Sequence, residues 1–187
     1  MAPKVKVSKE DIIKTTIELV REHGSNFINA RAIASALGCS TQPIFSNFNS
    51  MEELQDETIR YAYGVYLDFI KRELESGKYP QYKSFGMAYI RFAKEEKELF
   101  KLLFMRDRTN EELSPSPDFE ESVKLIMETN QVTQEKAMMM HLEMWTCVHG
   151  IATMLVTSFF SLDWEFISDM ITDIYLGIKA RHTSEEN

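Results

Sequence analysis

Four hydrogen-bonding side chains lie within one short stretch near the N-terminus: Thr41, Gln42, Ser46 and Asn47. Hydroxyl and amide groups of this kind can bond to the edges of base pairs in the major groove of DNA. A glutamine can make two hydrogen bonds to adenine, so Gln42 is a candidate base reader. The chemistry that this stretch predicts is recognition of duplex DNA.

The first element expected to position these side chains is a helix over about residues 29–37. Ile33, Ala34 and Leu37 repeat there at helical spacing, which predicts a buried side. Gly38 follows and can adopt the positive φ that ends a helix.

The second element is a helix over about residues 40–47, which would complete a helix-turn-helix. Ser40 or Thr41 can cap its N-terminus, and Pro43 fits its first turn, where no backbone N–H is needed. Its buried side is expected to consist of Ile44, Phe45 and Phe48. The outward face then carries no acid, which suits a helix laid in the major groove.

Charge is divided unevenly along the chain, whose net charge is −8. Residues 1–50 hold six basic and four acidic residues, a net charge of +2, which leaves 15 basic and 25 acidic residues, a net charge of −10, for residues 51–187. A mildly basic head on an acidic body fits a protein whose head alone meets phosphate, although ordinary variation in composition can give the same split. The acidic total excludes a protein that coats nucleic acid along its whole length.

Cysteines and apolar runs give little sign of export or of membrane insertion. Cys39 and Cys147 show no metal-ligand spacing, and so few cysteines suit a reducing cytoplasm. The N-terminus lacks the apolar core of a signal peptide. Residues 144–162 contain no Lys, Arg, Asp or Glu, but hydroxyls interrupt the run and no basic anchor flanks it. We expect a cytoplasmic protein in which this segment is a helix buried on nearly all sides.

Scarce glycine and proline, and the lack of alternating segments, predict an all-α fold of about nine helices. A capping box over 50–53 opens a long helix, with Asp56/Arg60 and Asp68/Arg72 as ion pairs on its outside. Helices are expected over about 8–24, 29–37, 40–47, 50–76, 85–92, 99–104, 118–129, 133–160 and 163–180, with a frayed tail from 181.

Residues 8–55 resemble the N-terminal pattern of the TetR family of transcriptional regulators. The motifs that carry the resemblance are Arg31-Ala32-Ile33-Ala34, Leu37-Gly38-Cys39-Ser40, Ile44-Phe45-Ser46-Asn47-Phe48 and Met51-Glu52-Glu53-Leu54. Downstream, Trp145-Thr146-Cys147-Val148-His149-Gly150 resembles a Trp-x-x-x-His-Gly element of one group of TetR C-terminal domains. With the change in composition near residue 50, this implies a helix-turn-helix DNA-binding domain over 1–50 and a ligand-binding and dimerisation domain over 51–187.

Two residues depart from the family pattern and remove contacts to the DNA backbone. Phe45 stands where the family usually has a tyrosine that binds phosphate, and Met51 stands where a lysine usually does so. Backbone binding should then depend on helix N-termini or on a basic arm. The arm consists of Lys4, Lys6 and Lys9.

Gln42 stands at a position that is often glycine in the family, which places a possible adenine reader at the groove; the alternative is a solvated surface residue. The expected DNA-binding residues are Asn29, Arg31, Ser40, Thr41, Gln42, Pro43, Phe45, Ser46 and Asn47. For Cys39, at the turn between the two helices, buried packing is expected rather than a thiol switch.

Residues 81–160 are rich in aromatic residues and methionine, most of which must form a core. Such side chains also line adaptable apolar pockets. His141 and His149 could orient a ligand there, although a structural histidine with a satisfied hydrogen bond is the plainer interpretation of each. The expected ligand-binding residues are Phe85, Tyr89, Phe104, Met138, His141, Trp145 and His149.

These patterns predict a one-component regulator, a repressor released from a palindromic operator by a small apolar molecule. It would be a homodimer through residues 133–180, with a seam formed by Val156, Phe159, Phe160, Ile167, Met170, Ile171, Ile174 and Ile178. The alternative is an adaptor or ligand carrier of the same fold that does not bind DNA specifically. No nucleophile–base pairing, metal motif or phosphate loop supports an enzyme, and no cofactor is expected.

Overall fold

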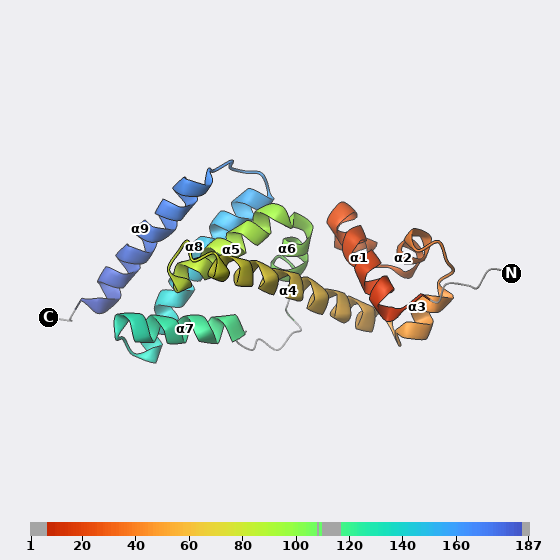
Figure 1. The fold of residues 1–187 in the computed structure, drawn as a ribbon, viewed down its shortest axis with the longest axis horizontal. Coiled ribbons are helices and arrows are strands. Elements are labelled where there is room, and N and C mark those ends of the chain that lie inside the picture. Colours follow the sequence, from red (N-terminus) through yellow and green to blue (C-terminus); the bar gives the residue numbers. More distant parts are fainter. Residues whose placement is uncertain (1–6, 108, 110–116, 185–187) are drawn as a thin grey trace. The chain divides into compact units, whose positions relative to one another are not determined.

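The computed structural model describes residues 7–107, 109 and 117–184. These residues form nine α-helices and one short 3-10 helix, and they contain no strand, so the predicted all-α fold is confirmed. The elements are α1 (Lys9–His23), η1 (Ser25–Phe27), α2 (Ala30–Ala36), α3 (Gln42–Asn47), α4 (Met51–Glu75), α5 (Gln81–Glu95), α6 (Lys97–Phe104), α7 (Pro117–Asn130), α8 (Gln134–Val156) and α9 (Trp164–Thr183) (Figure 1).

The chain divides into two compact units, and α4 runs through both. The first unit comprises residues 1–68 and 96–107, and the second comprises residues 69–95 and 108–187. Helix α6 therefore belongs to the same unit as α1, α2 and α3. The functional division into residues 1–50 and 51–187 stays a prediction.

The helix-turn-helix is built around a small apolar core in the first unit, where α1, α2 and α3 pack together. Its buried members come from all three helices and from the start of α4: Ile12, Ile33, Ala34, Ile44, Phe48 and Leu54. Gly38 ends the first helix of the motif with a φ of 63°, as its residue type predicts.

Capping side chains fix where most helices begin. Ser8 and Asp11 form a reciprocal capping box on α1, and Asp163 caps α9. Two predictions about caps need correction. Thr41 precedes α3 but makes no side-chain capping bond. Ser50 does accept from the Glu53 backbone N–H at 3.1 Å, but the Glu53 carboxylate turns to Asn49 instead of closing the box.

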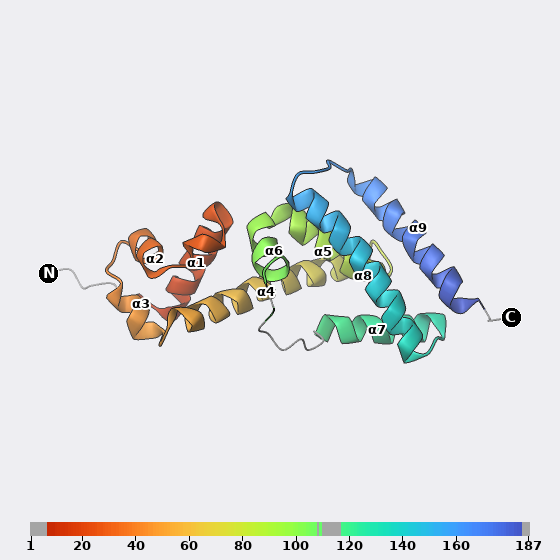
Figure 2. The same ribbon diagram turned by 180° about the vertical axis from the view of Figure 1, so that it is seen from behind.

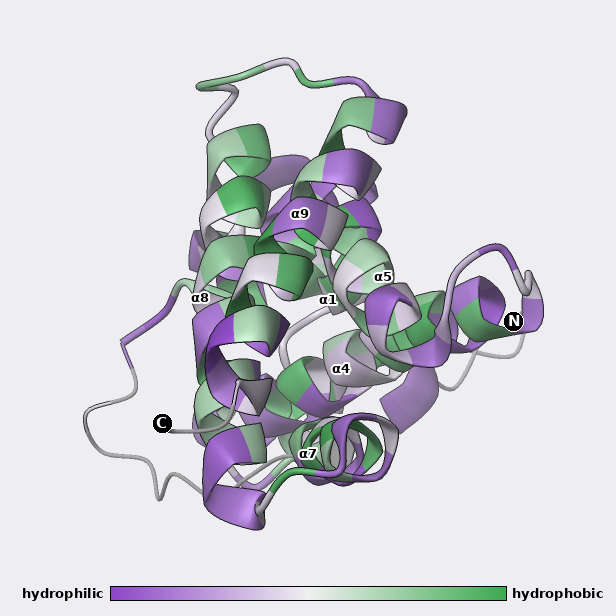
Figure 3. Ribbon diagram, turned by 90° about the vertical axis from the view of Figure 1, so that its left-hand side faces the viewer, coloured by the Kyte–Doolittle hydropathy of each residue, from purple (hydrophilic) through white to green (hydrophobic). Residues whose placement is uncertain are grey.

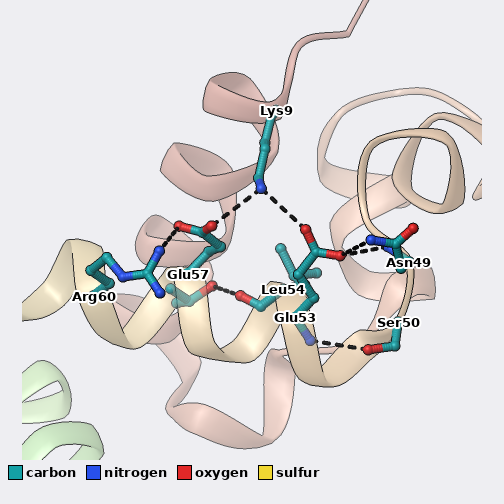
Figure 4. A network of polar contacts seen from close by, with 8 residues as sticks. Lys9, Asn49, Ser50, Glu53, Leu54, Glu57 and Arg60 are labelled. Carbon is teal, nitrogen blue, oxygen red and sulfur yellow. Dashed lines mark hydrogen bonds and ion pairs between the residues drawn. The ribbon is translucent and has the colours of Figure 1, made fainter.

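One of the two ion pairs predicted on α4 needs correction. Arg60 lies 2.9 Å from Glu57, three residues before it, where Asp56 was expected. On the other side of the same carboxylate, Lys9 of α1 binds Glu57 and Glu53, each at 3.2 Å (Figure 4). The Glu57 carboxylate therefore pairs both with Arg60 on its own helix and with Lys9 on α1.

In the second unit α8 packs against α5, α7 and α9 (Figure 2). Gly86 lets α5 approach α8 closely, because a Cβ there would meet Val148 Cγ2 at 3.3 Å. The C-terminal turns of α8 are hydrophobic (Figure 3), and Ile151, Leu155 and Val156 are buried. Packing within this unit therefore buries these three side chains.

The prediction that the apolar segment 144–162 is buried on nearly all sides is wrong. Helix α8 ends at Val156, four residues earlier than expected, and Ser158 follows with a φ of 56°. Trp145 and Met154 are exposed on α8, and Phe159 beyond it is 72% exposed. Within the part of the chain that the structure describes, no helix is long and apolar enough to cross a membrane.

Candidate nucleic-acid interface and effector site

The face of α2 and α3 away from the core carries most of the predicted DNA-binding residues. Exposed side chains there are those of Asn29, Arg31, Ser40, Gln42, Phe45 and Ser46, and partly exposed ones are those of Thr41, Pro43 and Asn47. Two segments separated by the Gly38 turn thus bring polar groups to one surface. Each residue's contact with DNA stays a prediction.

Phe45 does not belong to the buried side of α3, contrary to the sequence-based expectation. Ile44 and Phe48 are 0% and 2% exposed, whereas Phe45 is 55% exposed. A helix of six residues turns only one narrow stripe toward its core, and Ile44 occupies it, while Phe48 reaches the core from the extended residue that follows α3. Phe45 therefore lies on the outward surface.

Several polar side chains of this surface bond to the chain itself. The Asn29 amide oxygen caps α2 by accepting from the Ala32 N–H at 2.9 Å. Ser46 donates to the Gln42 carbonyl at 2.9 Å, and the Asn47 amide donates to the Pro43 carbonyl at 2.7 Å. These hydrogen bonds stabilise α2 and α3 themselves.

Lys9 is not a free cation of a basic arm, which corrects that expectation. Its ammonium group lies between two carboxylates, and its hydrogen bonds to Glu57 and Glu53 raise the pKa of Lys9 and lower the pKa of Glu57. The pKa of Glu53 is also lowered, first by the Asn49 backbone N–H. Lys4 and Lys6 lie outside the described residues.

Two other cations of the first unit, Lys14 and Arg21, are also paired with carboxylates. Lys14 pairs with Glu10 at 2.6 Å. Arg21 forms two hydrogen bonds to Glu96, at 2.9 and 2.7 Å, which raise its pKa. Among the described residues, Arg31 has no ion pair, so it is the cation that α2 leaves exposed.

Two tyrosine–histidine pairs join α5 to α8 in the second unit. The Tyr82 hydroxyl lies 3.0 Å from His141 Nδ1, and the Tyr89 hydroxyl lies 2.9 Å from His149 Nδ1. In the second pair, both the tyrosine and the histidine come later along their helices than in the first pair. Helices α5 and α8 therefore run in the same direction at this interface. Sequence reasoning missed Tyr82, whose partner lies 59 residues away.

His141 fits the structural interpretation of a core histidine. Its side chain lies among aromatic rings, with Phe119 edge-on at 4.7 Å between ring centroids, and the residue is 9% exposed. Burial strongly raises the pKa of Tyr82, so this hydroxyl stays protonated. A ligand role for His141 stays a prediction.

His149 lies at a more open position. The Trp145 ring stacks on it at 5.1 Å between centroids, and Trp145 itself is 45% exposed. Burial lowers the pKa of His149, which favours the neutral ring. One turn further on, Thr153 Oγ1 is buried and has no hydrogen-bond partner among the described residues.

The remaining predicted ligand-binding residues are scattered. Phe85 is buried on α5, and Met138 is 39% exposed on α8. Phe104 belongs to the first unit, where its ring meets Tyr66 edge-on at 5.3 Å. The structure therefore brings together Tyr89, Trp145 and His149.

The contacts of two cations on α5 were also missed by sequence reasoning. Lys83 donates to the hydroxyls of Ser168 and Thr172 at 2.7 Å each. Arg91 lies over the Trp164 ring at 4.4 Å and bonds to the buried carboxylate of Glu73 at 3.0 Å. No local spacing signals either contact, because α5 meets α9 only in the fold.

In the described ranges, no group of side chains is arranged for chemistry other than binding. No group of three or more His, Cys, Asp or Glu residues there is arranged to hold a metal ion. Cys39 packs against the core of the helix-turn-helix as a partly buried side chain, in agreement with the packing interpretation.

Comparison with known proteins adds one finding. Residues 82–173 match the family model described as tetracyclin repressor-like, C-terminal domain. The chain therefore contains a TetR-like C-terminal domain, which supports a place in the TetR family. No curated protein matches the chain. The likeness of residues 145–150 to the Trp-His-Gly group stays a prediction.

Proposed function

We propose that this protein is a ligand-responsive transcriptional regulator of the TetR family that binds duplex DNA through α2 and α3. The observation that carries the proposal is the combination of a helix-turn-helix, with an acid-free outward face, and a TetR-like C-terminal domain. Gln42 is exposed on α3 and suited to bond to adenine, and Arg31 is an exposed cation on α2.

The protein would act as a homodimer through residues 133–180, because one short recognition helix reads too few base pairs. Large apolar side chains exposed on α8 and α9 support this interface: Leu142, Met154, Phe166 and Leu176. The seam predicted from sequence needs correction. Val156, Ile167 and Ile171 are at most 4% exposed, so they pack within their own chain.

A small, mostly apolar molecule would bind beside Tyr89, Trp145 and His149 and release the protein from a palindromic operator. Aromatic walls and the unpartnered hydroxyl of Thr153 support a ligand with one polar group. Release requires that the ligand bind the DNA-free arrangement more tightly, by several kcal/mol for a nearly complete switch.

The second candidate is an adaptor or carrier of the same fold without specific DNA binding. Phe45 and Met51 lack groups that bind phosphate, and Lys9 is neutralised by two glutamates. These three observations are what favour the adaptor as the alternative to a DNA-binding regulator.

Selection from a pool of random duplex DNA distinguishes the two candidates. The regulator enriches a palindrome whose half-sites are spaced by about 10–10.5 base pairs or a multiple of that spacing. The adaptor enriches no sequence, although it is folded and dimeric. Enrichment by wild-type protein but not by a Gln42→Ala, Arg31→Ala variant would tie the activity to this face.

A further inference from the structure

The outward face of α3 presents an aromatic ring where a polar reader is expected. Phe45 is 55% exposed, although its neighbours Ile44 and Phe48 fill the core. An exposed phenyl ring offers apolar surface, and its burial against an apolar group of a partner would stabilise a complex.

The polar neighbours of Phe45 narrow the range of partners. Ser46 and Asn47 donate to carbonyls of α3 itself. The Gln42 side chain is exposed and makes no hydrogen bond within the described residues. Gln42 and Phe45 are thus the two long side chains that this face offers, one as a bidentate hydrogen-bonding group and one as an apolar surface.

Charge indicates which surface they meet. Between residues 25 and 50 the sequence contains one charged residue, Arg31, and no acid, in a chain of net charge −8. Such a surface does not repel a polyanion. In the major groove, the apolar group that base pairs display is the 5-methyl group of thymine, which apolar side chains contact.

Spacing then relates the two side chains. Residues three apart on a helix lie on one face, separated by about 4.5 Å along its axis. Base pairs are stacked about 3.4 Å apart. Gln42 and Phe45 can therefore reach neighbouring base pairs from one placement of α3.

We infer that Phe45 is a specificity-determining residue that reads a thymine 5-methyl group, on the base pair next to the adenine bound by Gln42. The recognition helix would thereby select two adjacent A·T pairs in each half-site. This inference rests on the proposed DNA-binding function and names the sequence class that the site selects.

The test uses the duplex that wild-type protein selects from random DNA. Each thymine of one half-site is replaced in turn by uracil, which removes the methyl group alone. We expect one replacement to weaken wild-type binding roughly fourfold, the effect of one buried methyl group. The Phe45→Ala variant should bind the duplex with thymine and the duplex with uracil at that position with equal affinity. The matched variant Gln42→Ala should retain the thymine preference.

The outcomes separate the inference from the function on which it rests. Equal wild-type binding of thymine and uracil at every position would overturn the reading by Phe45 and leave specific DNA binding intact. A thymine preference that persists in Phe45→Ala would overturn it as well. Failure of wild-type protein to select any duplex would overturn both.

Discussion

The Tyr89 hydroxyl lies 2.9 Å from Nδ1 of His149, and the Trp145 ring stacks on the other side of this contact, against the imidazole. The bond ties α5 to α8 beside the candidate effector site. When the proton of the neutral imidazole is on Nε2, Nδ1 accepts a hydrogen bond from the Tyr89 hydroxyl, and burial lowers the pKa of His149 from its ordinary value of 6.5. The contact is therefore sensitive to protonation.

The first prediction concerns the pH dependence of stability. The unfolded chain takes up a proton at His149 near pH 6.5, whereas the folded chain resists it. The stabilisation is therefore complete above pH 6.5 and is lost as pH falls toward the lower pKa of the folded state. His149→Gln should flatten the free energy of unfolding between pH 7 and 5, measured by urea denaturation. Tyr89→Phe keeps the titrating ring and should cost about 0.5–1.5 kcal/mol at pH 7. An unchanged pH dependence in His149→Gln would contradict this account.

The second prediction concerns the salt dependence of DNA binding. Because Phe45 and Met51 lack phosphate-binding groups and Lys9 is paired, the plot of log affinity against log salt should have a shallow slope. Each restored phosphate contact should steepen it by about 0.9. The variant Met51→Lys should therefore bind non-specific duplex more tightly at low salt, as measured by fluorescence anisotropy. A slope equal to that of wild type would show that residue 51 does not face the DNA backbone.

The third prediction concerns Trp145 as a wall of the effector site. In a Trp164→Phe background, binding of the amphiphilic dye 8-anilinonaphthalene-1-sulfonate, which has large aromatic rings and one anionic group, should change the fluorescence of Trp145. The background is mild, because the Trp164 ring N–H is buried without a partner. Trp145→Ala should weaken dye binding and leave the dimer intact. If Trp145→Ala instead gives a monomer, the residue belongs to the interface and the effector site lies elsewhere.

The fourth prediction concerns the homodimer. Leu176 on α9 is 55% exposed and lies within residues 133–180. Leu176→Glu would place a carboxylate in the apolar interface, so sedimentation equilibrium should show monomers. Met105 is similarly exposed, at 42%, but lies outside that range, and Met105→Glu serves as the matched control. Dimers that persist in Leu176→Glu would place the interface on another surface.

The helices were predictable because their signals are local. Ser8, Pro43 and Gly38 stand where a cap, a first turn and a helix end require them. Such signals act within one turn of helix and survive in any fold. The order of the helices, the turn of the helix-turn-helix and the core residue Ile33 follow from them.

The contacts of the site were less predictable because they join distant segments. Lys9 meets Glu57, 48 residues away, so its charge looked free in the sequence. His141 meets Tyr82 across two helices, which no spacing reveals. Phe45 was misplaced for a different reason: a six-residue helix contains too few apolar positions to define which of them face the core.

Comparison of wild type and Gln42→Ala on the selected duplex tests the central claim most directly. Affinities are measured for the selected duplex and for a series of duplexes, each of which has one base pair of a half-site replaced. Specific reading by α3 predicts that Gln42→Ala loses about 1–3 kcal/mol on the selected duplex and no longer discriminates at one base pair per half-site. Unchanged affinity and unchanged discrimination at every position would contradict the claim that this helix reads DNA.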